Sequence, residues 1–296
     1  MAYRFKHRQT VPQNVKRIAA EQLDSAIALL KRKRGASRED SIHKVRKSIK
    51  KTRALLRLVR PDLDGFFDDE NIRLRDVAHN LSDLRDAVAV IGTMDNLRHR
   101  RNGAGLAKPL ASVRRHVLRE KRQLEIQASA QKLLPAAASE LTKARQSIRY
   151  WPLKTDGFNA IAAGLRQTYR QGRKAMAAAR KSGRIEDYHE WRKRVKDLWY
   201  HVRLLNRIWG DVMSAYEQSL NRLEDALGED INLSILEKKV ATLAAGNASV
   251  PAASLRRAVD STRRELRRQA QETGAKVYAE KPREFVRQFQ RLWKSW

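Results

Sequence analysis

Two short basic segments, each headed by a histidine, are the residues best placed to do chemistry. The pattern H-x-x-R-K-x-x-K occurs twice, at an offset of 189 − 43 = 146 residues, at His43, Arg46, Lys47 and Lys50 and again at His189, Arg192, Lys193 and Lys196. Guanidinium groups bind phosphate oxygens in pairs, and ammonium groups bind them as mobile point charges. The two segments therefore indicate contact with a partner that carries many negative charges.

The spacing of the first segment places its cations on one side of a helix. His43, Arg46, Lys50, Arg53 and Arg57 are separated by 3, 4, 3 and 4 residues, which keeps them on one helical face. Apolar residues occupy the opposite face, where a core belongs: Ile42, Val45, Ile49, Leu56 and Val59. The stretch 41–60, which includes Lys51, holds eight Lys or Arg and no acid. Like charges at this spacing repel one another, and a row of bound anions would neutralise that repulsion.

The second segment repeats this arrangement. His189, Arg192, Lys196 and Arg203 share a helical face with Trp199. The residues placed to pack inward are Tyr188, Trp191, Val195, Leu198, Val202 and Leu205. If a two-fold axis relates the two copies, both basic faces border one channel, and a linear polyphosphate could lie along it. Further Arg clusters near 114–122, 166–173 and 256–268 either extend this surface or form solvated helix faces, because acids interrupt some of them.

The offset of 146 residues extends well beyond the basic segments. It aligns Leu58 with Leu204 and Leu81 with Leu227, so about 50 residues match without a gap. The sequence therefore predicts an all-α protein made of two duplicated helical bundles, residues 1–150 and 151–296. Helices are expected at about 12–33, 40–61, 68–97, 109–131, 135–149, 158–182, 185–208, 212–244, 251–273 and 282–296.

Composition sets the class of partner. The 296 residues include 63 Lys or Arg and 33 Asp or Glu, a net charge of +30 that a polyanion would relieve. The absence of Cys excludes disulfides and Cys-ligated zinc. The sequence shows no signal-peptide pattern and no long apolar run. A cytoplasmic protein without a membrane span is the simplest expectation.

The histidines and carboxylates permit two other interpretations of the chemistry. His43 and His189 invite a metal hypothesis, but neither segment places a second His or a carboxylate on the same face, so we expect no metal and no cofactor. The acidic pairs Asp83 and Asp86, and Glu229 and Asp230, leave open a metal-dependent phosphohydrolase. None of the common catalytic motifs accompanies them. We therefore expect a binding protein rather than an enzyme.

The two histidine segments resemble the CHAD family, the conserved histidine α-helical domain. The resemblance covers nearly the whole chain and includes the turn at 81–86. It implies two four-helix bundles related by pseudo-two-fold symmetry, polyphosphate bound in a basic central pore, and association with polyphosphate granules. The residues that it implies for polyphosphate binding are those of both segments together with Lys51, Arg53, Arg57 and Arg203. Asp197 and Trp199 depart from the family pattern, because bases are usual at both positions.

A nonspecific nucleic-acid-binding protein remains the main alternative. The charge and the helices would suit phosphate contact, and four aromatic side chains could stack on bases: Trp151, Trp191, Trp199 and Tyr200. Trp191, however, falls on the predicted core face. A peripheral membrane protein is less favoured, because no exposed apolar anchors adjoin the basic face of the repeated helix.

Overall fold

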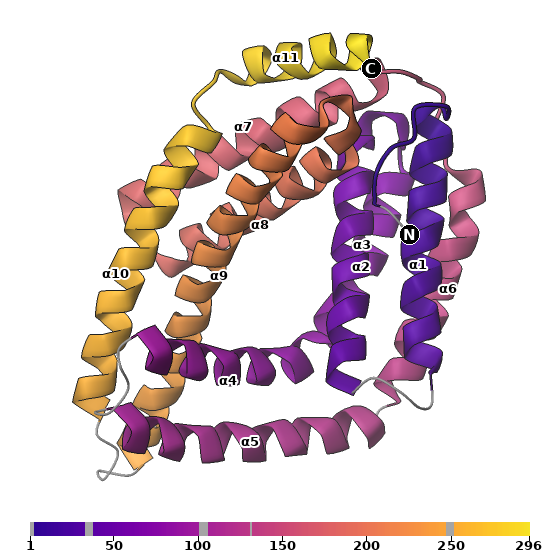
Figure 1. Cartoon of the computed structure of the whole chain (residues 1–296). Helices are drawn as coiled ribbons and strands as arrows, with labels where there is room; N and C mark the ends of the chain where they lie inside the picture. The colour runs from indigo at the N-terminus through magenta and orange to yellow at the C-terminus, as the bar shows by residue number, and fades with distance from the viewer. Residues whose placement is uncertain (1–2, 33–37, 101–105, 131, 247–251) are drawn as a thin grey trace.

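The computed structural model describes residues 3–32, 38–100, 106–130, 132–246 and 252–296, and over these ranges the chain forms helices and no strand (Figure 1). The α-helices are α1 (Val11–Lys31), α2 (Arg38–Leu58), α3 (Phe66–Asn80), α4 (Ser82–Arg100), α5 (Ala107–Ala130), α6 (Leu133–Ser147), α7 (Asn159–Ser182), α8 (Ile185–Leu204), α9 (Gly210–Gly246), α10 (Ala252–Val277) and α11 (Pro282–Ser295). The predicted all-α class is confirmed.

The bounds of these elements repeat at the offset seen in the sequence. Adding 146 to the short 3₁₀ helix η1 (Arg60–Asp62) gives the bounds of η4 (Asn206–Ile208), and adding it to α5 gives 253–276, within one residue of each end of α10. The packing partners repeat as well, because α1 packs on α2 as α7 packs on α8, and α4 packs on α5 as α9 packs on α10. A duplicated set of elements is therefore visible in the structure. The two-fold axis and the division at residue 150 stay predictions.

The two halves differ where one long helix was expected between residues 68 and 97. The chain interrupts that helix at Leu81, between α3 and α4, whereas its counterpart α9 is continuous. The Ser82 hydroxyl donates a hydrogen bond to the carbonyl of His79 there, and a serine bonded to its own backbone competes with helical hydrogen bonding. The equivalent position in α9 is Gly228, which has no such donor. The expectation of a single helix over 68–97 was wrong for this reason.

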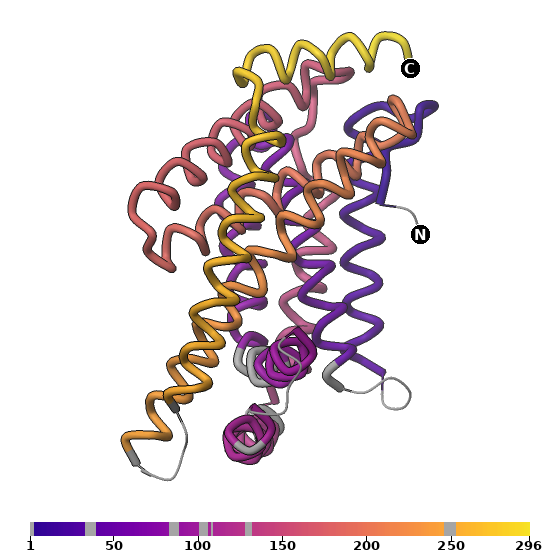
Figure 2. The backbone as a smooth tube through the Cα atoms, turned by 60° about the vertical axis from the view of Figure 1, so that its left-hand side comes forward, coloured from indigo at the N-terminus to yellow at the C-terminus, as the bar shows by residue number. Residues whose placement is uncertain are grey.

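Within the described ranges, buried apolar side chains gather in two clusters, and each cluster draws on both halves of the chain. The larger one joins α1, α2, α3 and α6 to α7, α8, α11, the N-terminal half of α9 and the C-terminal end of α10. The smaller one joins α4 and α5 to the C-terminal half of α9 and the N-terminal part of α10. Figure 2 shows α4 and α5 side by side, seen end-on. Burial of apolar surface is the main favourable contribution to folding, so the two halves stabilise each other.

Local sequence signals explain the helix ends and one close helix crossing. Thr10 caps α1, where its hydroxyl accepts from Gln13 N at 3.2 Å while the Gln13 side chain accepts from Thr10 N at 3.0 Å. Gly183 ends α7 with a φ of 66°, a conformation that favours glycine. Gly164 lets α7 approach the end of α2, because a Cβ there would overlap the carbonyl oxygen of Leu58. Among the described helices, none is long and apolar enough to span a membrane.

Candidate anion-binding site

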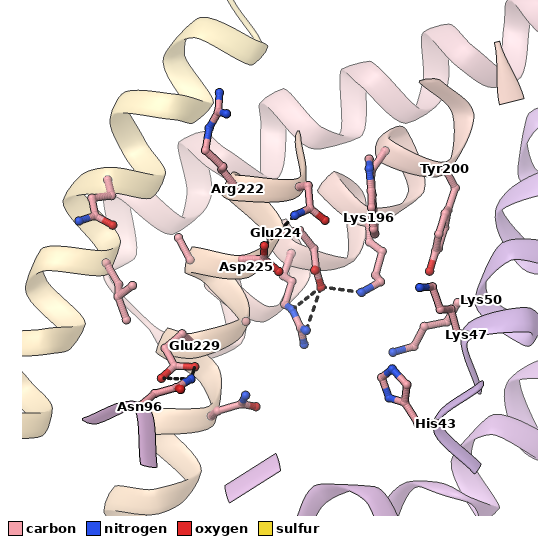
Figure 3. A pocket seen from close by; sticks show the side chains of 18 of the residues that line it. His43, Lys47, Lys50, Asn96, Lys196, Tyr200, Arg222, Glu224, Asp225 and Glu229 are labelled. Carbon is pink, nitrogen blue, oxygen red and sulfur yellow. Dashed lines mark hydrogen bonds and ion pairs between the residues drawn. The ribbon is translucent and has the colours of Figure 1, made fainter. Parts of the chain in front are cut away.

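A cavity of about 860 Å³ lies between the two repeated basic helices. Side chains from α2 and α8 face each other across it, and α4, α9 and α10 complete its wall. In Figure 3, His43, Lys47 and Lys50 extend from the α2 side, while Lys196 and Glu224 lie on the opposite side. The two histidine segments, 146 residues apart in the sequence, therefore meet at one site.

The wall of this cavity is rich in cations. Its basic side chains are Arg46, Lys47, Lys50, Arg100, Arg192, Lys196 and Arg222, and its carboxylates are Glu224, Asp225 and Glu229. Among the described residues of the wall, seven cations against three carboxylates leave an excess of four positive charges, before His43 and His99 are considered. Neighbouring like charges in a hollow raise the local concentration of ions of the opposite sign, so the cavity is suited to an anion with several charges.

The α2 side presents side chains that are partly exposed and held from behind. His43 and Lys47 are exposed, and Arg46 and Lys50 are half-buried. The guanidinium of Arg46 donates to the carbonyl of Ala78 in α3, which fixes the arginine against the neighbouring helix. The apolar residues on the other face, such as Val45 and Ile49, are fully buried. The amphipathic pattern in the sequence thus determines which face of α2 reaches the cavity.

The α8 side carries its own counter-ion. The buried carboxylate of Glu224, in α9, accepts from Arg192 Nη2 at 2.8 Å and from Lys196 Nζ at 2.7 Å. Burial raises the pKa of Glu224, but Arg192 and Lys196 outweigh that effect and hold the pKa below its usual value. Glu224 is therefore ionised at neutral pH and neutralises part of the second basic segment.

The family profile of the CHAD domain matches residues 17–241. The chain belongs to the CHAD family. The crystal structure of the CHAD domain from the plant Ricinus communis is similar to it over 98% of this chain and 95% of that one, with a TM-score of 0.58 and 14% sequence identity. At that identity the likeness concerns the fold. A comparison with curated proteins finds no match.

Half of the residues that the sequence analysis nominates for polyphosphate binding line the cavity. They are His43, Arg46, Lys47, Lys50, Arg192 and Lys196. The other nominated residues lie outside its lining: Lys51, Arg53, Arg57, His189, Lys193 and Arg203. Position along the helical face was sufficient to predict which residues near the middle of α2 line the cavity. It was not sufficient at the end of α2, because α2 and α8 approach each other there.

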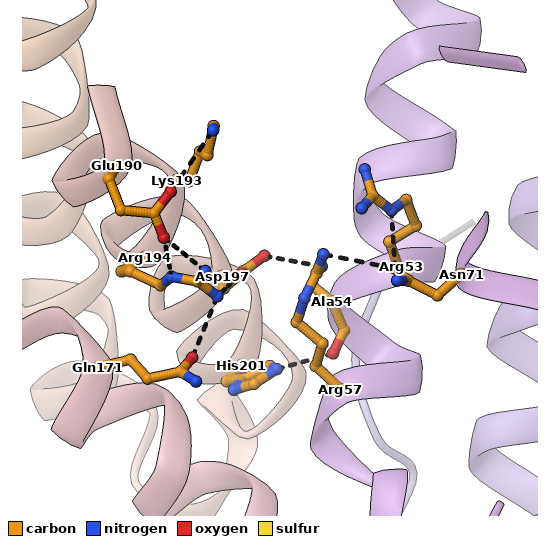
Figure 4. Close-up of polar contacts among 10 residues, drawn as sticks. All are labelled: Arg53, Ala54, Arg57, Asn71, Gln171, Glu190, Lys193, Arg194, Asp197 and His201. Atoms are coloured by element: carbon orange, nitrogen blue, oxygen red, sulfur yellow. Dashed lines mark hydrogen bonds and ion pairs between the residues drawn. The ribbon is translucent and has the colours of Figure 1, made fainter. Parts of the chain in front are cut away.

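Arg53 and Arg57 hold elements together near the contact between α2 and α8. Arg53 Nε donates to Asn71 Oδ1 at 3.0 Å, and Arg57 Nη1 contacts Asp197 Oδ1 of α8 at 3.2 Å (Figure 4). Asp197, one of the two departures from the family pattern, thereby links the halves. Below this pair, the buried His201 Nε2 lies 2.8 Å from the carbonyl of Ala54. These residues position the walls of the cavity rather than line them.

The remaining nominated residues outside the lining have contacts of their own. Arg203 Nε contacts Glu217 at 3.0 Å, and Lys193 Nζ contacts Glu190 at 3.4 Å. Lys51 Nζ lies 5.0 Å from the centre of the Tyr3 ring. Burial, and then Arg203 and Lys47, lower the pKa of Lys51 to about 8.

His189 is exposed, and its pKa is lowered. Partial desolvation is the largest cause, followed by the positive charges of Lys193 and Arg192. A lowered pKa favours the neutral imidazole at neutral pH. His189 therefore contributes hydrogen-bonding groups more than charge.

Several cavity residues were missed by the sequence analysis. Asn96, His99 and Arg100 come from α4, which follows the break at Leu81. Arg222 and Glu224 come from α9. The repeat contained a signal for Glu224. The offset of 146 residues aligns this acid with Ala78, just as it aligns Arg192 with Arg46.

The side chains that the alternative functions require are mostly engaged or buried. Asp230 is buried between Arg263 and Arg267, at 2.9 and 3.1 Å, and Glu229 accepts from Asn96 at 3.5 Å. The side chains of Asp83 and Asp86 lie outside the described residues. In the described part of the chain, no three His, Cys, Asp or Glu side chains come together in a way that could hold a metal ion.

The aromatic side chains considered for base stacking are largely covered. Trp151, Trp191 and Tyr200 are 2% exposed or less, whereas Trp199 is half-buried and lines the cavity. Trp199 also lies under cations, with Lys196 Nζ 5.7 Å and Arg203 Cζ 5.2 Å from its ring. Stacking on successive bases requires several open ring faces, which this group does not offer.

Proposed function

We propose that this CHAD protein binds inorganic polyphosphate, without catalysis, in the cavity between α2 and α8. The observation that carries the proposal is the meeting of Arg46, Lys47 and Lys50 with Arg192 and Lys196 around one hollow. A polyphosphate chain carries one negative charge for each internal phosphate group, so it can contact both walls at once. Contacts of this kind respond to charge spacing and have no need of base recognition.

A cytoplasmic location and association with polyphosphate granules belong to the same proposal. The net charge of +30 would let one molecule bind phosphate groups both in the cavity and outside it. Exposed arginines on α10, such as Arg256 and Arg257, would supply such secondary contacts. Imaging a fluorescently tagged protein beside a polyphosphate stain tests this part, and exclusion of the protein from the granules would contradict it.

The direct test is a charge reversal inside the cavity, compared with a matched one outside it. We expect Arg46→Glu with Lys50→Glu to weaken polyphosphate binding at least 100-fold, because each charge-assisted contact contributes about 1.5–3 kcal/mol. Arg180→Glu with Lys181→Glu changes the net charge equally at two exposed positions of α7 that do not line the cavity, and should weaken binding much less. Isothermal titration of both proteins measures the difference, and equal losses would contradict the site.

Two further measurements separate this function from its competitors. Long polyphosphate should displace DNA and RNA at equal phosphate concentration, and failure to do so would favour the nucleic-acid-binding alternative. Incubation of the protein with polyphosphate, with and without magnesium, should release no phosphate. Release that depends on magnesium and is lost in Glu229→Gln would favour a phosphohydrolase instead.

A further inference from the structure

The two repeated basic segments have different partners in the structure. In the first half, Arg46 donates to a backbone carbonyl, that of Ala78. In the second half, the equivalent Arg192 contacts the carboxylate of Glu224, and 224 − 146 = 78, so the two acceptors occupy equivalent positions. At these equivalent positions, the second half therefore has a glutamate where the first half has an alanine.

Glu224 contacts two cations of the second segment that line the cavity, Arg192 and Lys196. Its Oε1 lies 2.7 Å from Lys196 Nζ, 2.8 Å from Arg192 Nη2 and 3.0 Å from Arg192 Nε. Glu224 is only 4% exposed, yet it lines the cavity, as Figure 3 shows. Gly228 leaves room for the arginine, because a Cβ there would lie 3.0 Å from Arg192 Nη2. The second segment is thus arranged around an internal anion.

We propose that Glu224 acts as an internal competitor of the ligand and sets the affinity of the cavity for phosphate. The inference rests on the proposed function. A phosphate group that approaches Arg192 and Lys196 meets the repulsion of Glu224, and the carboxylate already satisfies part of the hydrogen-bonding capacity of both cations. Only an anion that also reaches Arg46 and Lys50 on α2 gains enough attraction to bind. Glu224 therefore favours long polyvalent chains over small anions.

Glu224→Gln removes the charge and keeps an oxygen that can orient Arg192 and Lys196. We expect this variant to bind polyphosphate at least tenfold more tightly, because it removes a negative charge that lies a few ångströms from the bound phosphates and repels them. The dependence of log K on log salt should become steeper by about one, since one more phosphate is neutralised in the complex. Inorganic triphosphate, a short anion, should gain measurable affinity. Titrations at three salt concentrations provide all of these values.

The matched control is Asp230→Asn, also on α9. Asp230 is a buried carboxylate between two arginines, as Glu224 is between two cations, but it does not line the cavity. The two variants change the net charge equally and remove similar ion pairs, and Asp230→Asn should leave the affinity within about twofold of the wild type. Should Glu224→Gln fail to fold, Glu224→Asp withdraws the carboxylate by one methylene and should give a smaller gain.

The possible outcomes distinguish this inference from the function on which it rests. Tighter binding and a steeper salt dependence in Glu224→Gln alone would support it. A wild type that binds polyphosphate, with Glu224→Gln equal or weaker, would overturn the inference and leave the proposed function standing. Equal gains in Glu224→Gln and Asp230→Asn would trace the effect to net charge and would also overturn it. No binding by the wild type would overturn both.

Discussion

At the scale of single residues, the contact between the halves contains a histidine that is held neutral. His201 is fully buried, and its Nε2 lies 2.8 Å from the carbonyl of Ala54. Burial is the largest influence and lowers the pKa of His201 to about 4, although the bond to Ala54 and the charge of Asp197 act in the opposite direction. The imidazole therefore fills a space in the core of the native protein and carries no charge at neutral pH.

The buried histidine predicts a loss of stability in mild acid. The unfolded chain takes up a proton at His201 below about pH 6.5, whereas the native chain does so only near pH 4, so stability falls as pH falls through this interval. We expect the free energy of unfolding to fall by about 3 kcal/mol from this group between pH 7 and pH 4. Urea unfolding at several pH values measures it.

The equivalent residue of the first half supplies the control for this experiment. Leu55 stands 146 positions before His201 and is also fully buried, so His201→Leu replaces a titrating group by the residue that the repeat uses there. Between pH 7 and pH 4, the free energy of unfolding of the variant should fall by about 3 kcal/mol less than that of the wild type, whatever the stability of the variant at pH 7. An unchanged pH dependence in the variant would show that other groups cause the acid sensitivity.

At the scale of helices, the close crossing of α7 and α2 depends on one glycine. A Cβ at Gly164 would overlap the carbonyl oxygen of Leu58, and a backbone atom cannot move aside as the end of a side chain can. We expect Gly164→Ala to lower the free energy of unfolding by about 1–3 kcal/mol, as overpacking does in a well-packed core. Gly92→Ala, in α4, places its Cβ where no atom lies within 4 Å, and should be stabilising by about 0.5–1 kcal/mol. Thermal unfolding of both variants checks the two signs, and a stabilised Gly164→Ala would contradict the crossing.

The sequence predicted the helices well and their spatial relations less well. The alternation of His43, Arg46 and Lys50 with buried apolar residues determined the face of α2 that reaches the cavity, because helical geometry fixes that relation locally. Helical periodicity did not predict the break at Leu81, since a serine hydroxyl that bonds to its own helix gives little signal in an apolar pattern, although the family resemblance included a turn at 81–86. Asn96 and Arg100, which line the cavity, follow that break in the sequence. Helical spacing and the family resemblance placed Arg57 in the site, whereas in the structure it contacts Asp197, which is 140 residues away in the sequence and could not be paired with it from local pattern.

At the scale of the whole molecule, both hydrophobic clusters are shared between the duplicated halves. Val90 and Val113 of the first half pack in one cluster with Leu236 and Val259 of the second. The cavity is shared in the same way, since α2 supplies one wall and α8 and α9 supply the other. The two parts of the chain related by the repeat thus complete each other, and we expect the proposed polyphosphate binding to depend on both.

This sharing predicts how the separated halves behave. Residues 1–150 and 151–296, expressed apart, should each expose apolar surface that is buried in the whole chain, and should bind a hydrophobic dye that the intact protein does not bind. Mixing the two should reduce dye binding and restore polyphosphate affinity, because both the clusters and the cavity walls are then completed. The intact chain measured at the same concentration is the control. Shared burial leaves neither half with a complete core. If each separate half unfolds cooperatively, binds no dye and retains polyphosphate affinity, the cores of the two halves are independent and the prediction is wrong.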